Sequence, residues 1–333
     1  MKPALSNQKP APRTIRRSRQ PSFQVGSMST FKWLASLALA AAILPVLHAE
    51  QRCPGNVAGL PFRLVHRSQI IAPVTINRTG PYDFLVDTGA EITMISPSLA
   101  SELQLKSEGG EARVLAVGHQ SRASFSRLEL IQAGPLAIAD HQVLVSKLDY
   151  SLGFDMHIRG ILGANFLGRF DGLIDNAHQM LCLDDTGAIQ IAMKGQHIAL
   201  VTPTPPADGG RPSCSLLLAV HLSSAGSSPL SLKLDSGSDA PFLYDPAKYL
   251  NVRVSGSRLF QGQNADGIVR TFALLPSQDV RIGDVVLPRI SFATLLGANH
   301  DGYRPEGDGL LPTGLFRSVY IGCADRFVIL VPW

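Results

Sequence analysis

Two short stretches decide how this chain folds: FLVDTGAEITMIS over Phe84–Ser96 and LKLDSGSD over Leu232–Asp239. In each, an apolar run ends in an aspartate, which is followed by a hydroxyl residue and a glycine. The two aspartates are 148 residues apart. An apolar run that ends at turn-forming residues is typical of a buried strand leading into a tight loop. The sequence therefore predicts two similar strand–loop units in one chain.

A second pair of similar stretches follows the first pair at nearly the same distance. GILGANFL covers Gly160–Leu167 and GLLPTGLF covers Gly309–Phe316, 149 residues further on. Two matched elements at one spacing indicate a duplicated lobe of roughly 120 residues. We assign the first lobe to residues 50–201 and the second lobe to residues 213–333. The segment between them, 202–212, is rich in proline and glycine and is predicted to be a linker.

Around these stretches the sequence alternates short apolar runs with turn residues. The chain has 30 glycines and 23 prolines in 333 residues, which suits strands joined by turns better than long helices. The one good short helix is predicted over Pro97–Leu105, with Ser96 as its N-cap. The predicted strands of the first lobe cover Phe62–Val65, Ile70–Ile76, Tyr82–Val86, Ala112–Val117, Leu128–Ile131, Gln142–Val145 and Met180–Leu183.

The first 49 residues do not belong to the predicted fold. Trp33–Leu47 is almost wholly apolar, follows Lys32, and is followed by a small-residue cleavage site ending at Ala49. At about 1.5 Å per residue the run is too short for a membrane span, so it predicts a signal peptide cleaved after Ala49. The protein is then exported, periplasmic or extracellular, with no stable membrane span after cleavage. An uncleaved anchor is the alternative, and Met28 is an alternative start to Met1.

Charge and cysteine content narrow the function classes further. Residues 1–49 hold 7 of the 30 basic side chains and none of the 26 acidic ones, so the remainder has 23 basic and 26 acidic residues and a net charge of −3. This balance gives no reason to expect nucleic-acid binding. Four cysteines suit an exported protein with disulfides, and all three possible pairings remain open. We expect no metal and no cofactor. The cysteines are Cys53, Cys182, Cys214 and Cys323.

Asp87 and Asp235 are the candidate catalytic residues. Two carboxyl groups about 3 Å apart cannot both ionise, so the pair holds one proton and can act as base and acid together. The residues after each aspartate support this chemistry. The hydroxyls of Thr88 and Ser236 can brace the opposite loop, and Gly89 and Gly237 allow close backbone approach to a carboxylate.

These residues resemble the aspartic proteases, and most closely the retropepsin-like group. FLVDTGAEITMIS matches the catalytic strand and loop of that family, and GILGANFL matches the apolar element that packs beneath the loop. The resemblance covers most of residues 60–333 and is stronger in the first lobe. It implies an all-β fold in which two related β-barrel lobes enclose an active-site cleft. It also implies an aspartic endopeptidase that acts on peptides or proteins.

The same resemblance implies a glycine-tipped hairpin, or flap, over the cleft. Gly118, His119 and Gln120, near the middle of residues 113–130, are the candidate tip, and residues 262–267 are a weaker counterpart in the second lobe. The alternative is an ordinary surface hairpin.

The second lobe departs from the family pattern. Ser236 replaces the usual threonine, and Pro312 stands where the first lobe has Gly163. Two alternatives therefore stay open beside a single-chain monomer, which we favour. One is a homodimeric protease that uses only Asp87. The other is a non-catalytic bilobal protein that binds peptides without cutting them.

Overall fold

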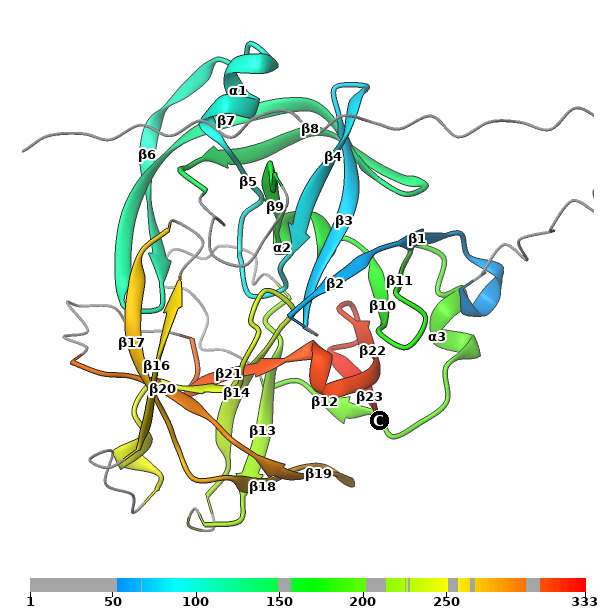
Figure 1. Cartoon of the computed structure of the whole chain (residues 1–333). Coiled ribbons are helices and arrows are strands. Elements are labelled where there is room, and N and C mark those ends of the chain that lie inside the picture. The colour runs from blue at the N-terminus through cyan, green and yellow to red at the C-terminus, as the bar shows by residue number, and fades with distance from the viewer. Residues whose placement is uncertain are drawn as a thin grey trace, which may run out of the picture. The chain divides into compact units, whose positions relative to one another are not determined.

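The computed structural model describes residues 53–66, 68–148, 157–201, 214–224, 226, 228–250, 257–263, 267–297 and 306–333. The predicted signal peptide and linker lie outside these residues and stay predictions. The described part of the chain is dominated by strands, which confirms the predicted all-β class (Figure 1). The strands form three sheets, and the predicted closure of the lobes into barrels stays a prediction.

The first half of the chain forms an eight-stranded sheet with the order β2-β3-β4-β9-β5-β8-β7-β6. All seven strands predicted for this half coincide with observed ones, but the hairpin strands are longer than their apolar runs. In these hairpins the polar residues face solvent on one side, so the sequence alternates and the apolar signal fades. The strands are β2 (Arg63–Val65), β3 (Gln69–Ile76), β4 (Thr79–Val86), β5 (Met94–Ile95), β6 (Ser107–Ala116), β7 (His119–Ala133), β8 (Leu136–Val145) and β9 (Gly160–Leu162).

The second half forms a nine-stranded sheet with the order β16-β17-β20-β15-β21-β14-β13-β18-β19. From β13 to β16 this order repeats that of β3 to β6 in the first half. Two short strands, β17 and β18, take the place of the long β7, because β18 pairs with β13 as β7 pairs with β3. The strands are β13 (Leu217–Leu222), β14 (Leu230–Asp235), β15 (Phe242–Leu243), β16 (Arg258–Gln263), β17 (Val269–Leu274), β18 (Gln278–Ile282), β19 (Val285–Ile290), β20 (Ala293–Leu295) and β21 (Gly309–Pro312).

A six-stranded sheet with the order β1-β11-β10-β22-β23-β12 joins the two halves. Its central pair is β10 from the first half and β22 from the second, antiparallel with Leu173 opposite Tyr320, and the two lie side by side in Figure 1. The sheet makes the halves one folding unit. Its strands are β1 (Gly59–Pro61), β10 (Asp171–Asp175), β11 (Met180–Asp184), β12 (Ile198–Ala199), β22 (Phe316–Gly322) and β23 (Phe327–Pro332).

Helices are few and short. The predicted helix is α1 (Pro97–Glu102), and the Ser96 hydroxyl caps it by accepting from the Leu99 N–H at 3.2 Å. It ends earlier than predicted, because Gln104 adopts a left-handed conformation with φ 52° that no helix continues through. No helix among the described residues has the length and apolar character needed to cross a membrane. The other helical segments are α2 (Ala164–Leu167), α3 (Ala188–Ala192), η1 (Pro54–Asn56), η2 (Pro246–Lys248) and η3 (Thr313–Leu315).

Each disulfide lies within one half of the chain. Cys53 pairs with Cys182, and Cys214 pairs with Cys323. The first bond ties the start of the described chain to β11, and the second ties the start of the second half to the turn between β22 and β23. The sequence left three pairings open, and the structure selects this one.

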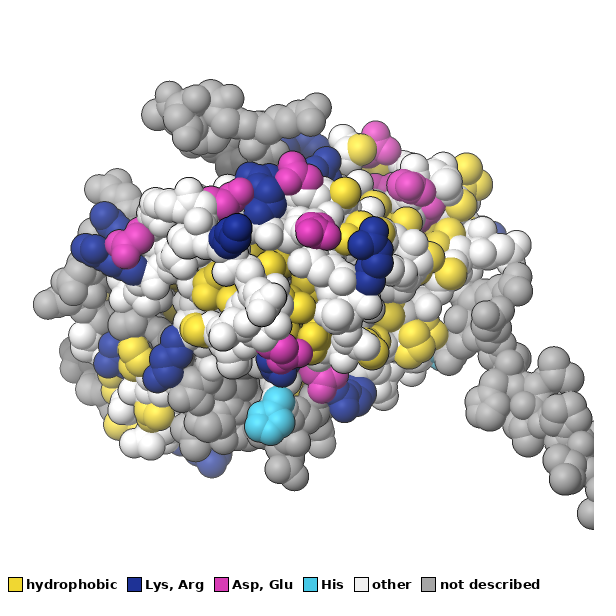
Figure 2. Space-filling view, turned by 90° about the horizontal axis from the view of Figure 1, so that it is seen from above, with side chains coloured by type: hydrophobic (Ala, Val, Ile, Leu, Met, Phe, Trp, Pro, Cys, Tyr) yellow, Lys and Arg dark blue, Asp and Glu magenta, His cyan; other side chains and the backbone are white. Residues whose placement is uncertain are grey.

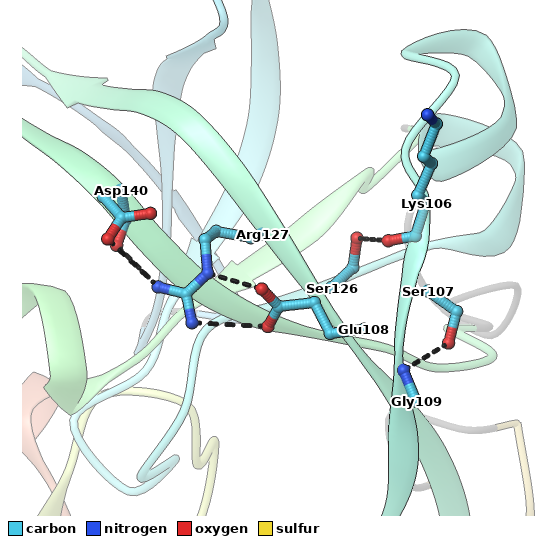
Figure 3. A network of polar contacts seen from close by, with 7 residues as sticks. All are labelled: Lys106, Ser107, Glu108, Gly109, Ser126, Arg127 and Asp140. Carbon is cyan, nitrogen blue, oxygen red and sulfur yellow. Dashed lines mark hydrogen bonds and ion pairs between the residues drawn. The ribbon is translucent and has the colours of Figure 1, made fainter.

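The surface carries charges of both signs. Arg127 on β7 lies between Glu108 and Asp140, with its Nε 2.5 Å from Glu108 Oε1 and its Nη1 3.3 Å from Asp140 Oδ2 (Figure 3). Such exposed pairs contribute at most about 1 kcal/mol each. Basic and acidic side chains are interspersed over the face seen in Figure 2. On the described part of this face, the charges are not gathered into one patch of a single sign.

Candidate active site

Both predicted catalytic aspartates lie at the ends of buried central strands. Asp87 directly follows β4, and its N–H donates to the Leu162 carbonyl of β9 at 3.0 Å. Asp235 is the last residue of β14, which runs parallel to β21 with Asp235 opposite Pro312. The residues before the aspartates, Val86 and Leu234, are fully buried. The buried end of each strand fixes the position at which its loop begins.

Thr88 and Ser236 lock the two loops together through four hydrogen bonds. The Thr88 N–H donates to Ser236 Oγ at 3.0 Å, and the Ser236 N–H donates to Thr88 Oγ1 at 3.1 Å. Each hydroxyl then donates to a carbonyl of the opposite strand. Thr88 Oγ1 bonds the Leu234 carbonyl at 2.9 Å, and Ser236 Oγ bonds the Val86 carbonyl at 2.7 Å. The exchange is reciprocal, as the predicted bracing role requires.

The interlocked loops bring the two carboxyl groups into hydrogen-bond contact with each other. The glycines make this approach possible. A Cβ added to Gly89 would lie 2.7 Å from Asp235 Cγ, and one added to Gly237 would lie 2.4 Å from Asp87 Cγ. Both distances are shorter than a real Cβ tolerates, so only glycine fits at these positions.

Backbone donors hold the two carboxylates unequally. Asp87 Oδ1 accepts from the N–H groups of Gly89 at 2.8 Å and Ala90 at 3.0 Å. Asp235 Oδ1 accepts from the N–H of Gly237 at 2.8 Å, the one backbone donor to this carboxyl among the described residues. Hydrogen bonds to a carboxylate favour its ionised form. The two chemically identical side chains therefore sit in different electrostatic environments.

Burial raises the pKa of both aspartates above the ordinary value. For Asp87, desolvation outweighs the hydrogen bonds from Asp235, Gly89 and Ala90, and its pKa is raised. For Asp235, desolvation and the negative charge of Asp87 act in the same direction, and its pKa is raised well above 3.8. The pair therefore carries one proton over a wide pH range, with Asp87 the more acidic member. One base and one acid are available at the same point.

The predicted flap tip lies at the turn between β6 and β7. Gly118 adopts φ +71° there, a conformation that favours glycine, while His119 and Gln120 begin β7 opposite Ala116 and Leu115. The tip contacts the second half: Arg270 of β17 donates to the Gly118 carbonyl at 3.2 Å, and a Cβ on Gly118 would lie 2.3 Å from Leu295 Cδ2. The weaker counterpart is the hairpin of β16 and β17, whose turn lies outside the described residues.

The second copy of the packing element keeps its strand although it contains a proline where the first copy has a glycine. Gly163 lies so close to the first loop that an added Cβ would be 2.7 Å from the Ile92 carbonyl carbon. Pro312 is the corresponding residue at the end of β21. It precedes the 3-10 helix η3, whereas Gly163 precedes the α-helix α2. A proline needs no N–H there, since a helix start leaves that group unpaired anyway. The substitution changes the helix and leaves the strand beside Asp235 in place.

Three residues at the loops escaped the sequence prediction. Ser68 Oγ donates to the Ser238 carbonyl and Gln69 Nε2 to the Gly237 carbonyl, both at 2.8 Å. Lys233 Nζ donates to the Gly89 carbonyl at 3.1 Å. Ser68 and Gln69 lie in no motif, so no pattern in the sequence marked them. Lys233 did give one, because it is a charged residue inside an otherwise apolar strand.

A comparison with family models agrees with this geometry. Residues 72–166 match the model described as aspartyl protease. This part of the chain is similar to the aspartyl proteases. The matched residues contain β4, Asp87 and its loop, and the packing element, which are the features on which the predicted resemblance rested. Asp235 lies outside the match, so its role rests on the geometry described above.

Solved structures of similar proteins include two aspartic proteases. The aspartic proteinase from Irpex lacteus is 12% identical with a TM-score of 0.48, over 82% of this chain and 96% of that one. The retropepsin-like aspartic protease from Rickettsia conorii is 23% identical with a TM-score of 0.26, over 34% of this chain and 81% of that one. A search of curated protein sequences found no significant match.

Proposed function

We propose that this aspartic protease is an endopeptidase that hydrolyses peptide bonds with a water molecule activated by Asp87 and Asp235. One observation carries the proposal. The two loops exchange four hydrogen bonds through Thr88 and Ser236, and this lock holds two buried carboxyl groups in contact. Keeping two carboxyl groups together out of water destabilises the fold, so their retention indicates a functional role for the pair.

The chemistry follows from a pair that holds one proton. The ionised carboxylate takes a proton from water while the water oxygen bonds to the scissile carbonyl carbon. The protonated carboxyl gives its proton to the carbonyl oxygen, which yields a neutral tetrahedral diol. When the C–N bond breaks, one carboxyl group gives its proton to the departing nitrogen, and a hydroxyl of the diol returns a proton to the other carboxylate as it becomes the carbonyl of the product. The pair ends the cycle with one proton, as it began.

The test is peptide cleavage by two single variants. Asp87→Asn and Asp235→Asn keep the shape of the side chain but remove the base or the shared proton. Each should abolish cleavage, and the double variant should be scarcely worse, because groups that act as a unit lose activity non-additively. Pepstatin should inhibit the wild-type protein. Circular dichroism of each variant must match the wild type for the comparison to hold.

The outcomes separate the alternatives. If Asp235→Asn keeps full activity, a homodimer through Asp87 replaces the single-chain pair. If the wild-type chain binds extended peptides but cuts none between pH 3 and pH 7, the protein is a peptide-binding relative and the proposed activity is wrong.

A further inference from the structure

Lys233 is a charged side chain inside a buried strand. It lies on β14, two residues before Asp235, between Leu232 and Leu234, both of which are fully buried. Its own side chain is only 12% exposed. Lysine is rarely this buried unless it is paired. The corresponding position of the first half, 148 residues earlier, is Leu85, so the duplication does not require a cation here.

The ammonium group of Lys233 has two partners. Nζ donates to the Gly89 carbonyl at 3.1 Å and forms an ion pair with Glu306 Oε2 at 3.2 Å. Glu306 in turn accepts a hydrogen bond from the Ser215 hydroxyl. The partners fix the ammonium group at the loop of the first half, although the lysine belongs to the second half.

The peptide unit that Lys233 contacts is also the one that holds Asp87. The Gly89 carbonyl and the Ala90 N–H belong to one peptide group, and that N–H donates to Asp87 Oδ1 at 3.0 Å. A cation on the carbonyl side polarises the peptide group and strengthens the hydrogen bond on the N–H side. The charge of Lys233 is thus transmitted to the Asp87 carboxylate by a chain of two hydrogen bonds.

The other loop has no equivalent. Its Gly237 carbonyl accepts from the neutral amide of Gln69 at 2.8 Å. The positive charge of Lys233 lowers the pKa of both aspartates, but its hydrogen bond reaches only the loop of Asp87, and Glu306 is the acid that faces the lysine. The symmetric loops therefore receive one charged and one neutral donor.

We propose that Lys233 is a positioning residue that breaks the symmetry of the pair, by tying the Gly89–Ala90 peptide group to Asp87 and placing a fixed positive charge on that side. It makes Asp87 the carboxylate that stays ionised and leaves the shared proton with Asp235. This division of roles rests on the proposed function for its use in catalysis. The electrostatic effect itself does not, because it exists in the resting protein.

The direct test is the titration of the pair in the full chain, followed by NMR of aspartate labelled at the carboxyl carbon. Lys233→Met keeps the aliphatic stem but removes the charge and the donor. We expect the titration of the Asp87 carboxyl to move upward by about one pH unit. Lys233→Arg keeps the charge and should return it toward the wild-type position.

Three further variants separate charge from packing. Gln69→Met removes the neutral donor from the other loop and should leave the Asp87 titration in place. Glu306→Gln removes the acid that opposes the lysine, so the titration should move downward. If Lys233→Met fails to fold because Glu306 is left unpaired, the double variant Lys233→Met/Glu306→Gln has no orphaned charge, and it should show the upward shift.

Activity gives a second readout. The apparent pKa of the acid limb of the kcat/KM–pH profile should rise in Lys233→Met and fall in Glu306→Gln. An unchanged Asp87 titration in both Lys233→Met and the double variant would overturn the proposal, whether or not the chain cuts peptides. Conversely, if Lys233→Met shifts the Asp87 titration while the wild-type chain cuts no peptide, the role of Lys233 is supported and the proposed function is refuted.

Discussion

At the residue scale, the glycines after the aspartates are constrained by contact and not by backbone conformation. We expect Gly237→Ala to reduce peptidase activity at least a hundredfold, because the new Cβ would lie 2.4 Å from Asp87 Cγ and push the carboxyl groups apart. Gly226→Ala is the matched control, since nothing lies within 4 Å of its added Cβ. Initial rates on one peptide substrate compare the two. Equal activity would mean that the carboxyl groups need not touch.

Asp235 should also limit stability. Its folded-state pKa is raised well above 3.8, so the folded protein holds a proton that the unfolded chain releases at neutral pH. The free energy of unfolding is therefore highest below pH 4 for this group and falls as pH rises toward its folded-state pKa.

Asp235→Asn removes that penalty. We expect the variant to melt at a higher temperature than the wild type at pH 7, and the difference to shrink toward pH 4. Thermal unfolding at the two pH values measures this. A variant that is less stable than the wild type at pH 7 would show that the carboxyl group is not strained by burial.

At the element scale, a buried histidine supports the packing element. His141 on β8 is 3% exposed, and its Nε2 lies 3.3 Å from Thr93 Oγ1, which also accepts from the Gly163 N–H. Burial, together with the charge of Arg169, lowers the pKa of His141 to about 4. The neutral ring therefore suits the fold, and protonation opposes it.

Acid should weaken the protein through this group. The unfolded chain takes up a proton near pH 6.5, whereas the folded protein resists until about pH 4. The contribution of His141 is thus complete above pH 6.5 and lost between pH 6.5 and pH 4, at most about 3 kcal/mol. His141→Gln should lose less stability than the wild type over this range in urea unfolding, whereas the exposed control His221→Gln should follow the wild type. Parallel losses in all three proteins would contradict the assignment.

The elements show how far the sequence could be read. The buried ends of β4 and β14 were visible as apolar runs, and the aspartates marked where those runs end. The sequence predicted the hairpin of β6 and β7 near its tip, but it did not predict the start of β6 near Ser107. There the residues are exposed and glycine-rich, so local sequence carries little strand signal and the pairing partner decides.

At the scale of the whole molecule, the six-stranded sheet was beyond the sequence. The duplication predicted two lobes of one plan, and the repeated strand order agrees with it. The repeat does not predict that β10 of one half pairs with β22 of the other. Both are ordinary apolar strands, and their pairing depends on long-range contacts. The same limit left the disulfides open. Cysteine spacing does not determine pairing, whereas the sheet places Cys53 beside Cys182.

One hydrogen bond crosses the centre of this sheet. Tyr320 on β22 is fully buried, and its hydroxyl donates to Asp171 Oδ2 of β10 at 2.9 Å. Burial raises the pKa of Asp171, and the tyrosine opposes that rise by stabilising the ionised form. The bond joins the two halves of the chain.

Tyr320→Phe should therefore lower the free energy of unfolding by about 1 to 2 kcal/mol at pH 7, since the Asp171 carboxylate loses its donor while partly buried. In acid, once Asp171 is protonated, the loss should be smaller, and the raised pKa of Asp171 brings this change to a higher pH than for an ordinary aspartate. Asp171→Asn in the same chain removes the charge that needs the donor, so the double variant should regain part of the loss, which a double-mutant cycle in urea measures.

Tyr249→Phe, which removes a tyrosine–aspartate contact inside the second half, is the matched control. If the halves unfold as one unit, Tyr320→Phe should lower the urea midpoint for loss of activity and the urea midpoint for unfolding together, and Tyr249→Phe should show no coupling to Asp171→Asn in the same kind of cycle. Additive losses in the cycle would mean that Tyr320 and Asp171 do not stabilise the seam as a pair.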